Sequence, residues 1–259
     1  MPTQDILISS NPAIGAERVS PDGSSVSLHL DNRLGIHAEA KNITLSVIGA
    51  EVWFNFPNIT SSNNMFIFYL NDIKYERRLP DGLYSGSTIA DAFLRKINES
   101  SVPGLPTGDW FVLEGDEALN RMTLKLNQDA ANKNFTMAWT ESNISPILGF
   151  TSDTKGLNTH IAENLPTFNQ VNYLLLQSDM VHNGISINGQ HNSILAKVHI
   201  DVSPNSQILY APSNPAHIST PELAGIHRRD FKFTMLNDKM RPINTGGEFW
   251  SAHIRLSWQ

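Results

Sequence analysis

The residues best suited to chemistry in this sequence are nine histidines, and none of them has the spacing of a metal site. A zinc site of the H-E-x-x-H type places two histidines on one face of a helix, with a glutamate between them. That pattern is absent from the sequence. His29, His199 and His253 fall at polar positions of alternating segments, which predicts histidines in solvent or at an interface. We therefore expect no metal ligand and no bound cofactor.

The other reactive side chains also lack a catalytic pattern. Glu114, Asp116 and Glu117 could supply oxygen ligands to calcium, but they lack the further ligands of the twelve-residue calcium loop and fit a solvated hairpin tip. The chain has no cysteine, which excludes thiolate catalysis and cysteine-bound zinc. Residues 82–86 lack the lysine of a phosphate-binding loop, and no G-x-S-x-G elbow is present. The sequence predicts a protein that is not an enzyme.

The charge and hydropathy of the chain argue against nucleic acid and a membrane as its partners. The formal net charge is −6, so the chain lacks the basic footprint of a nucleic-acid-binding protein. No segment approaches the roughly 20 apolar residues needed to cross a bilayer, and the first residues do not resemble a secretion signal. We expect no direct contact with nucleic acid, no transmembrane segment and synthesis in the cytoplasm.

The elements that would position these residues are mostly strands. Apolar and polar residues alternate in many short segments, most regularly over residues 250–258, as in strands buried on one face. One helix is predicted over residues 88–98, because Ile89, Phe93 and Ile97 share a face and Thr88 with Asp91 resembles a capping box. The fold class is therefore mainly β.

About eight strands lie outside the middle of the chain, a number that suits a jelly-roll β-sandwich. The middle combines hairpins with the helix and reads as an inserted α+β domain. We expect an N-terminal arm at 1–20, a jelly roll from 21–60 plus 169–259, and the insertion at 61–168. Two consecutive domains split near residue 165 are the alternative.

Surface contacts are expected at two places. The run His227, Arg228, Arg229 and Asp230 is the one local cluster of positive charge, and it suits a subunit interface or a solvated strand entry. Tyr84 and Trp110 are candidates for exposed aromatic residues that bind a ligand. Core packing is expected instead for Trp53, Trp139 and Trp250.

Several segments together resemble the minor capsid, or penton-like vertex, proteins of tailless icosahedral DNA viruses of the adenovirus lineage, including polinton-like viruses, virophages and membrane-containing phages. The matching segments are residues 51–59 with Asn63 and Asn64, residues 79–84 before the helix, residues 147–150, residues 210–212, residues 231–243 and the closing strand.

The resemblance implies a structural virion protein that closes capsid vertices by self-association and contact with the major capsid protein. It implies a homo-oligomer, with a pentamer favoured and a trimer open, located in the virion after assembly in the host cytoplasm or nucleus. A spike domain that binds a host receptor or glycan, and a small double-jelly-roll major capsid protein, stay open as alternatives. None of the matching segments is a catalytic motif.

Overall fold

The computed structural model describes residues 2–14, 18–30, 34–98, 111–116, 119–127, 134–155, 158–169, 171–187, 189, 192–226 and 228–259. Over these residues the chain divides into two compact units. Unit 1 combines residues 1–56 with residues 171–259, and unit 2 consists of residues 57–170. Each unit has its own hydrophobic core.

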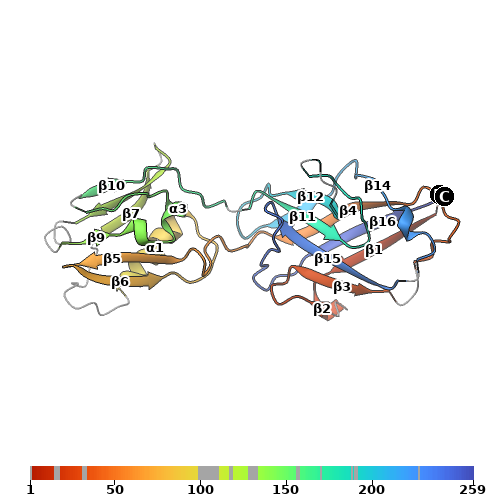
Figure 1. Ribbon diagram of the computed structural model, residues 1–259, viewed down its shortest axis with the longest axis horizontal. Coiled ribbons are helices and arrows are strands. Elements are labelled where there is room, and N and C mark those ends of the chain that lie inside the picture. The colour runs from red at the N-terminus through yellow and green to blue at the C-terminus, as the bar shows by residue number, and fades with distance from the viewer. Residues whose placement is uncertain are drawn as a thin grey trace. The chain divides into compact units, whose positions relative to one another are not determined.

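Unit 1 is a sandwich of two antiparallel five-stranded sheets, the mainly β jelly-roll fold that the sequence predicts (Figure 1). The first sheet has the order β1 (Thr3–Ser9), β16 (Ser251–Ser257), β4 (Thr44–Trp53), β13 (Gln207–Tyr210), with β14 (Ile218–Ser219) also on β4. The second has the order β12 (Ile194–His199), β11 (Tyr173–Ser178), β15 (Asp230–Asn237), β3 (Ser25–His29), β2 (Arg18–Val19). Short 3-10 helices lie at Pro12–Ile14 and Pro221–Leu223.

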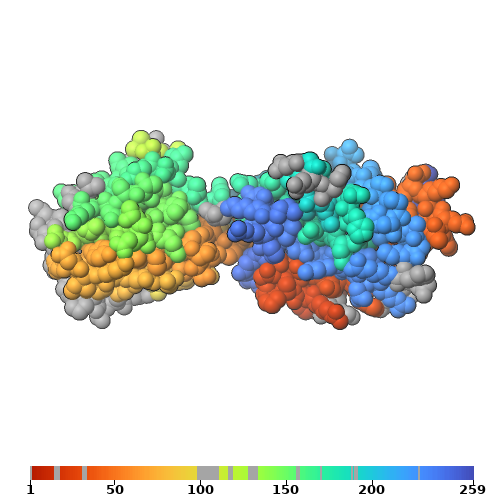
Figure 2. All heavy atoms as spheres, in the orientation of Figure 1, coloured from red at the N-terminus to blue at the C-terminus, as the bar shows by residue number. Residues whose placement is uncertain are grey.

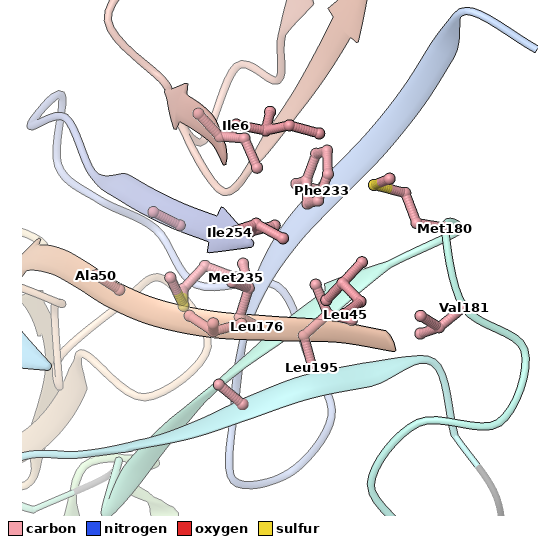
Figure 3. Packing of buried hydrophobic residues seen from close by; sticks show 14 of the residues in the cluster. Ile6, Leu45, Ala50, Leu176, Met180, Val181, Leu195, Phe233, Met235 and Ile254 are labelled. Atoms are coloured by element: carbon pink, nitrogen blue, oxygen red, sulfur yellow. The ribbon is translucent and has the colours of Figure 1, made fainter. Parts of the chain in front are cut away.

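The core of unit 1 lies between these two sheets. Ile6 of β1, Ile254 of β16, Leu176 of β11 and Phe233 of β15 project into one cluster (Figure 3). The alternation of apolar and polar residues along each strand produces this arrangement, because every second side chain faces the opposite sheet. Strands from both ends of the sequence therefore share one core, and red and blue segments adjoin on the surface of unit 1 (Figure 2).

Within the segment 1–20, expected as an arm, the seven residues Thr3 to Ser9 pair with β16 as the edge strand β1. Ile6 and Ile8 are buried, while Leu7 between them faces outward. Because Ile6, Leu7 and Ile8 are all apolar, the alternation between buried and exposed positions is not visible in the sequence. The residues of β1 are therefore part of the sandwich.

Residues 44–53 form one strand, β4, with an irregularity in its pairing with β16. The register against β16 shifts so that Gly49 pairs with His253 and Val47 with Ile254, which leaves Ile48 as the extra residue of a β-bulge. A bulge absorbs one residue and bends the strand without ending it. Gly49 thus marks a bulge inside β4.

Unit 2 contains two three-stranded sheets and one long helix. One sheet has the order β10 (Thr159–Ile161), β8 (Arg121–Leu126), β7 (Phe111–Asp116), and the other β6 (Ile73–Arg78), β5 (Met65–Leu70), β9 (Thr136–Met137). The helices are α1 (Gly86–Asn98), the short α3 (Ser145–Leu148) and a 3-10 turn at Trp139–Glu141. No described helix has the length and apolar character required to span a membrane.

Local sequence explains the main turns of unit 2. Asn71 and Asp72 have φ values of 49° and 65°, as the two-residue turn between β5 and β6 requires. The helix begins two residues earlier than predicted, and its cap is Ser85. The amide of Thr88 donates to Ser85 Oγ at 3.2 Å and the amide of Ser85 donates to Thr88 Oγ1 at 2.8 Å. Thr88 is thus the reciprocal partner of the cap, and Asp91 has no part in it.

Asn58 joins the two ends of unit 2. Its Nδ2 donates to the carbonyl oxygens of Tyr84 at 2.7 Å and Phe168 at 3.0 Å, and its Oδ1 accepts from the Tyr84 amide at 2.8 Å. The side chain is buried, so each of these bonds replaces one that water would otherwise make. The chain therefore enters and leaves unit 2 at neighbouring points.

Candidate interaction surfaces

The basic cluster before β15 is largely engaged within its own chain. Arg228 forms an ion pair with Asp179, and its guanidinium lies 5.2 Å from the ring centre of Phe231. The hydrogen bond that His29 Nδ1 donates to Asp230, at 2.9 Å, holds the pKa of that carboxyl below its usual value. Within the described residues, no hydrogen bond or ion pair engages the Arg229 side chain. His227 lies outside the described residues, and whether the cluster forms an interface stays a prediction.

Tyr84 and Trp110, the aromatic residues predicted to bind a ligand, are not shown to share a site in the described part of the chain. Trp110 lies outside the described residues. Tyr84 is half-buried, and its hydroxyl donates to the carbonyl oxygen of Pro80 at 2.9 Å. Burial raises the pKa of the Tyr84 hydroxyl. The ring also packs against Gly82, so this side chain is held in the turn before α1.

Ser152, His160 and Glu163 form an arrangement that resembles a catalytic triad. Ser152 Oγ and Glu163 Oε1 lie 3.5 Å and 3.1 Å from the same ring nitrogen of His160, Nε2. In a catalytic triad the hydroxyl contacts one ring nitrogen of the histidine and the carboxylate contacts the other. Here the second ring nitrogen, His160 Nδ1, is buried and has no partner among the described residues. The three side chains therefore lack the geometry of a catalytic relay, and their hydrogen bonds connect the two ends of the loop between residues 152 and 163. In the same described part of the chain, no group of three or more histidine, aspartate or glutamate side chains could hold a metal ion.

The electrostatics of this loop centre on Glu163. Partial burial favours the neutral carboxyl, but hydrogen bonds from Ser152 Oγ, the Thr151 amide and His160 outweigh it and lower the pKa of Glu163 to about 2. The carboxylate is thus ionised throughout the neutral range. It stabilises the loop that contains β10.

The acidic residues of the β7 to β8 hairpin do not form a shared site. Glu114 forms an ion pair with Lys125 on the neighbouring strand. Residue 117 and the side chain of Asp116 lie outside the described residues. The structure therefore gives Glu114 a pairing role within the sheet.

Exposed apolar side chains lie along both edges of the first sheet of unit 1. Leu7, with 67% of its surface exposed, and Ile14 lie at the β1 edge. Leu209, 64% exposed, lies on the opposite edge strand β13, with Trp53 on the adjacent strand β4. Trp53 is 40% exposed, so its expected core packing is wrong, whereas Trp139 and Trp250 are buried as predicted. In β4 it is Val52 that faces the core, which turns Trp53 outward.

The exposed apolar residues at these two edges were not predicted, although the sequence contains a pattern that indicates them. Ile6, Leu7 and Ile8, and likewise Ile208 and Leu209, are consecutive apolar residues on strands with one buried face. Because neighbouring side chains point to opposite faces, at least one residue of each run must face solvent or a partner. Such runs on edge strands are candidates for contact surfaces.

Comparison with known proteins gives a likeness of fold. No protein-family model and no curated protein matches the sequence. Among solved structures, the mavirus penton protein matches with a TM-score of 0.51 and 10% sequence identity, over 100% of this chain and 100% of that chain. The likeness thus extends over both units, and the fold of this chain is similar to that of a penton protein.

Proposed function

We propose that this chain is a structural capsid subunit of the penton type, which closes capsid vertices by self-association. The observation that carries the proposal is the full-length likeness to the mavirus penton protein, which includes the inserted unit as well as the jelly roll. In this proposal the subunit resides in the virion and contacts the major capsid protein. Its surfaces, and no active site, perform the function.

The edges of the first sheet offer candidate surfaces for the contacts of a closed ring. A ring of identical subunits uses two different patches, one on each flank of the subunit, that contact each other head to tail. Strands β1 and β13 lie at opposite edges of the sheet, and each edge exposes a leucine by about two thirds of its surface. We assign the edge at β1, which exposes Leu7, and the edge at β13, which exposes Leu209, as the two halves of the head-to-tail contact between subunits. We call them the Leu7 edge and the Leu209 edge, and we assign Arg229 as a further polar contact.

The double-jelly-roll alternative is disfavoured by the second unit. A major capsid protein of that type would repeat the sandwich, whereas the described part of unit 2 has two three-stranded sheets and α1. A spike domain would also associate, but as a trimer. The number of subunits therefore separates the remaining alternatives.

The test is the mass of the full chain in solution, measured by light scattering at several concentrations. We expect a pentamer, and we expect Leu7→Asp and Leu209→Asp each to convert it to a monomer. Ile73→Asp is the matched control, because Ile73 is an exposed apolar residue on an edge strand of unit 2. A monomeric wild-type chain would overturn the proposal, and a trimer would favour the spike.

A mixing experiment tests the head-to-tail geometry. Leu7→Asp keeps an intact Leu209 edge, and Leu209→Asp keeps an intact Leu7 edge, so a mixture can form one native junction. We expect the equimolar mixture to form dimers that do not grow into rings. If the mixture stays monomeric, the two edges are not partners.

A further inference from the structure

Unit 2 contains a cavity of about 770 Å³ beside the first turns of α1. This volume lies in the range of roughly 300–1,000 Å³ found for small-molecule sites. The walls come from α1, from the β7 to β8 hairpin and from residues 165–168. The lining residues are Gly86, Ser87, Ala90, Asp91, Leu113, Glu114, Gly115, Asn120, Arg121, Met122, Leu165, Pro166 and Phe168.

One side of the cavity is apolar. Ala90, Leu113 and Met122 are buried at its base, and Phe168 lies against them. Beside Gly115 there is open space, because a Cβ atom built there meets nothing within 4 Å. A ligand would therefore find an aromatic ring and an apolar floor.

The polar side of the cavity has unused hydrogen-bonding capacity. The side chains of Asp91, Asn120 and Arg121 make no hydrogen bond or ion pair within the part of the chain that the structure describes. Glu114, by contrast, is paired with Lys125. The charges of Asp91 and Arg121 offset each other, so the lining favours a ligand without net charge.

We propose that this cavity is a binding site for a neutral saccharide. A carboxylate, an amide and a guanidinium together accept and donate hydrogen bonds in fixed planar directions, which suits neighbouring sugar hydroxyls. The C–H face of a sugar ring packs on an aromatic ring such as Phe168. This site goes beyond the proposed capsid role and does not depend on it.

The test is saturation-transfer NMR on the full-length protein. The probes are lactose, N-acetyllactosamine, maltotriose, cellotriose, chitotriose and mannotriose, with sialyllactose as the anionic comparison. We expect at least one neutral probe to bind. Gly115→Val should place a branched side chain in the cavity, and Asp91→Ala and Arg121→Ala should remove hydrogen bonds, so that each variant weakens binding at least tenfold.

Matched controls separate the site from the fold. Gly115 lies in a strand without a positive φ, so valine suits its backbone. Val112→Ala on the same strand and Arg78→Ala on β6 lie outside the cavity lining and should retain binding. Binding of none of the neutral probes, binding of sialyllactose alone, or retained binding by Gly115→Val would each overturn the proposal. The subunit number of Gly115→Val should equal that of the wild type, so a failure here leaves the capsid proposal intact.

Discussion

At the scale of single residues, the clearest electrostatic feature is the carboxylate of Glu163. Its pKa is about 2 in the folded protein, against an ordinary value of 4.5. A carboxyl with a lowered pKa stabilises the fold fully above its unfolded value, and the stabilisation is lost as the pH falls toward the folded value. The contribution of Glu163 should therefore be complete above about pH 4.5 and absent below about pH 2.

This linkage predicts the pH dependence of Glu163→Gln. We expect the variant to melt below the wild type at pH 7, because the loop loses its ionised acceptor, and the difference should shrink as the pH falls from 4.5 toward 2. Thermal unfolding across this range measures it. Glu39→Gln is the control, since Glu39 is exposed and has no hydrogen bond or ion pair within the described residues. A pH-independent difference between wild type and Glu163→Gln would contradict the assignment.

At the scale of elements, the pairing of β1 predicts opposite behaviour for two adjacent residues. Ile8 is 1% exposed, and Ile8→Ala should destabilise unit 1 by about 2–4 kcal/mol through lost burial and the cavity left behind. Leu7→Ala should change the stability of the isolated subunit little, because Leu7 faces outward. Chemical denaturation at a low protein concentration, where subunits are separate, measures both. Equal small effects would mean that this segment is an arm after all.

Elements with strict alternation could be predicted from sequence, and elements without it could not. Residues 250–258 alternate regularly and contain β16, and the hairpin of β5 and β6 follows from its Asn-Asp turn. The strand β1 could not be predicted from alternation, because the outward-facing Leu7 is apolar like its buried neighbours. The strand β10 has three residues within a polar stretch, and only its pairing with β8 defines it. Long-range pairing is a tertiary effect that a local pattern does not contain.

The candidate surfaces were predictable to a smaller extent. Arg228 and Asp230 were singled out for their charge, but their intramolecular partners Asp179 and His29 are distant in sequence. The cavity of unit 2 combines residues from three segments between 86 and 168, so no spacing could indicate it. Residue type alone placed Trp53 in the core, where the register of β4 turns it outward.

At the scale of the whole molecule, two separate cores predict two independently folding parts. We expect calorimetry to show two transitions, and we expect the jelly roll to fold when residues 57–170 are replaced by a linker of about four glycine and serine residues. The Asn58 side chain is hydrogen-bonded to the Phe168 carbonyl, so the first and last residues of the insert lie near each other. Circular dichroism of the shortened chain should show a cooperative strand-rich fold that retains one of the two transitions. An unfolded product would show that unit 1 depends on the insert.

The buried amide of Asn58 also has a consequence for the order in which the chain folds. Closing a flexible loop costs free energy that rises with the logarithm of its length. A folded insert whose ends are held together acts as a short connection, which lowers the cost of bringing β4 and β11 into one sandwich by about 2 kcal/mol compared with the same residues as a flexible loop. Synthesis completes residues 57–170 before the second half of the sandwich exists. The insert is thus placed to fold first and to speed the long-range pairing of the jelly roll that surrounds it.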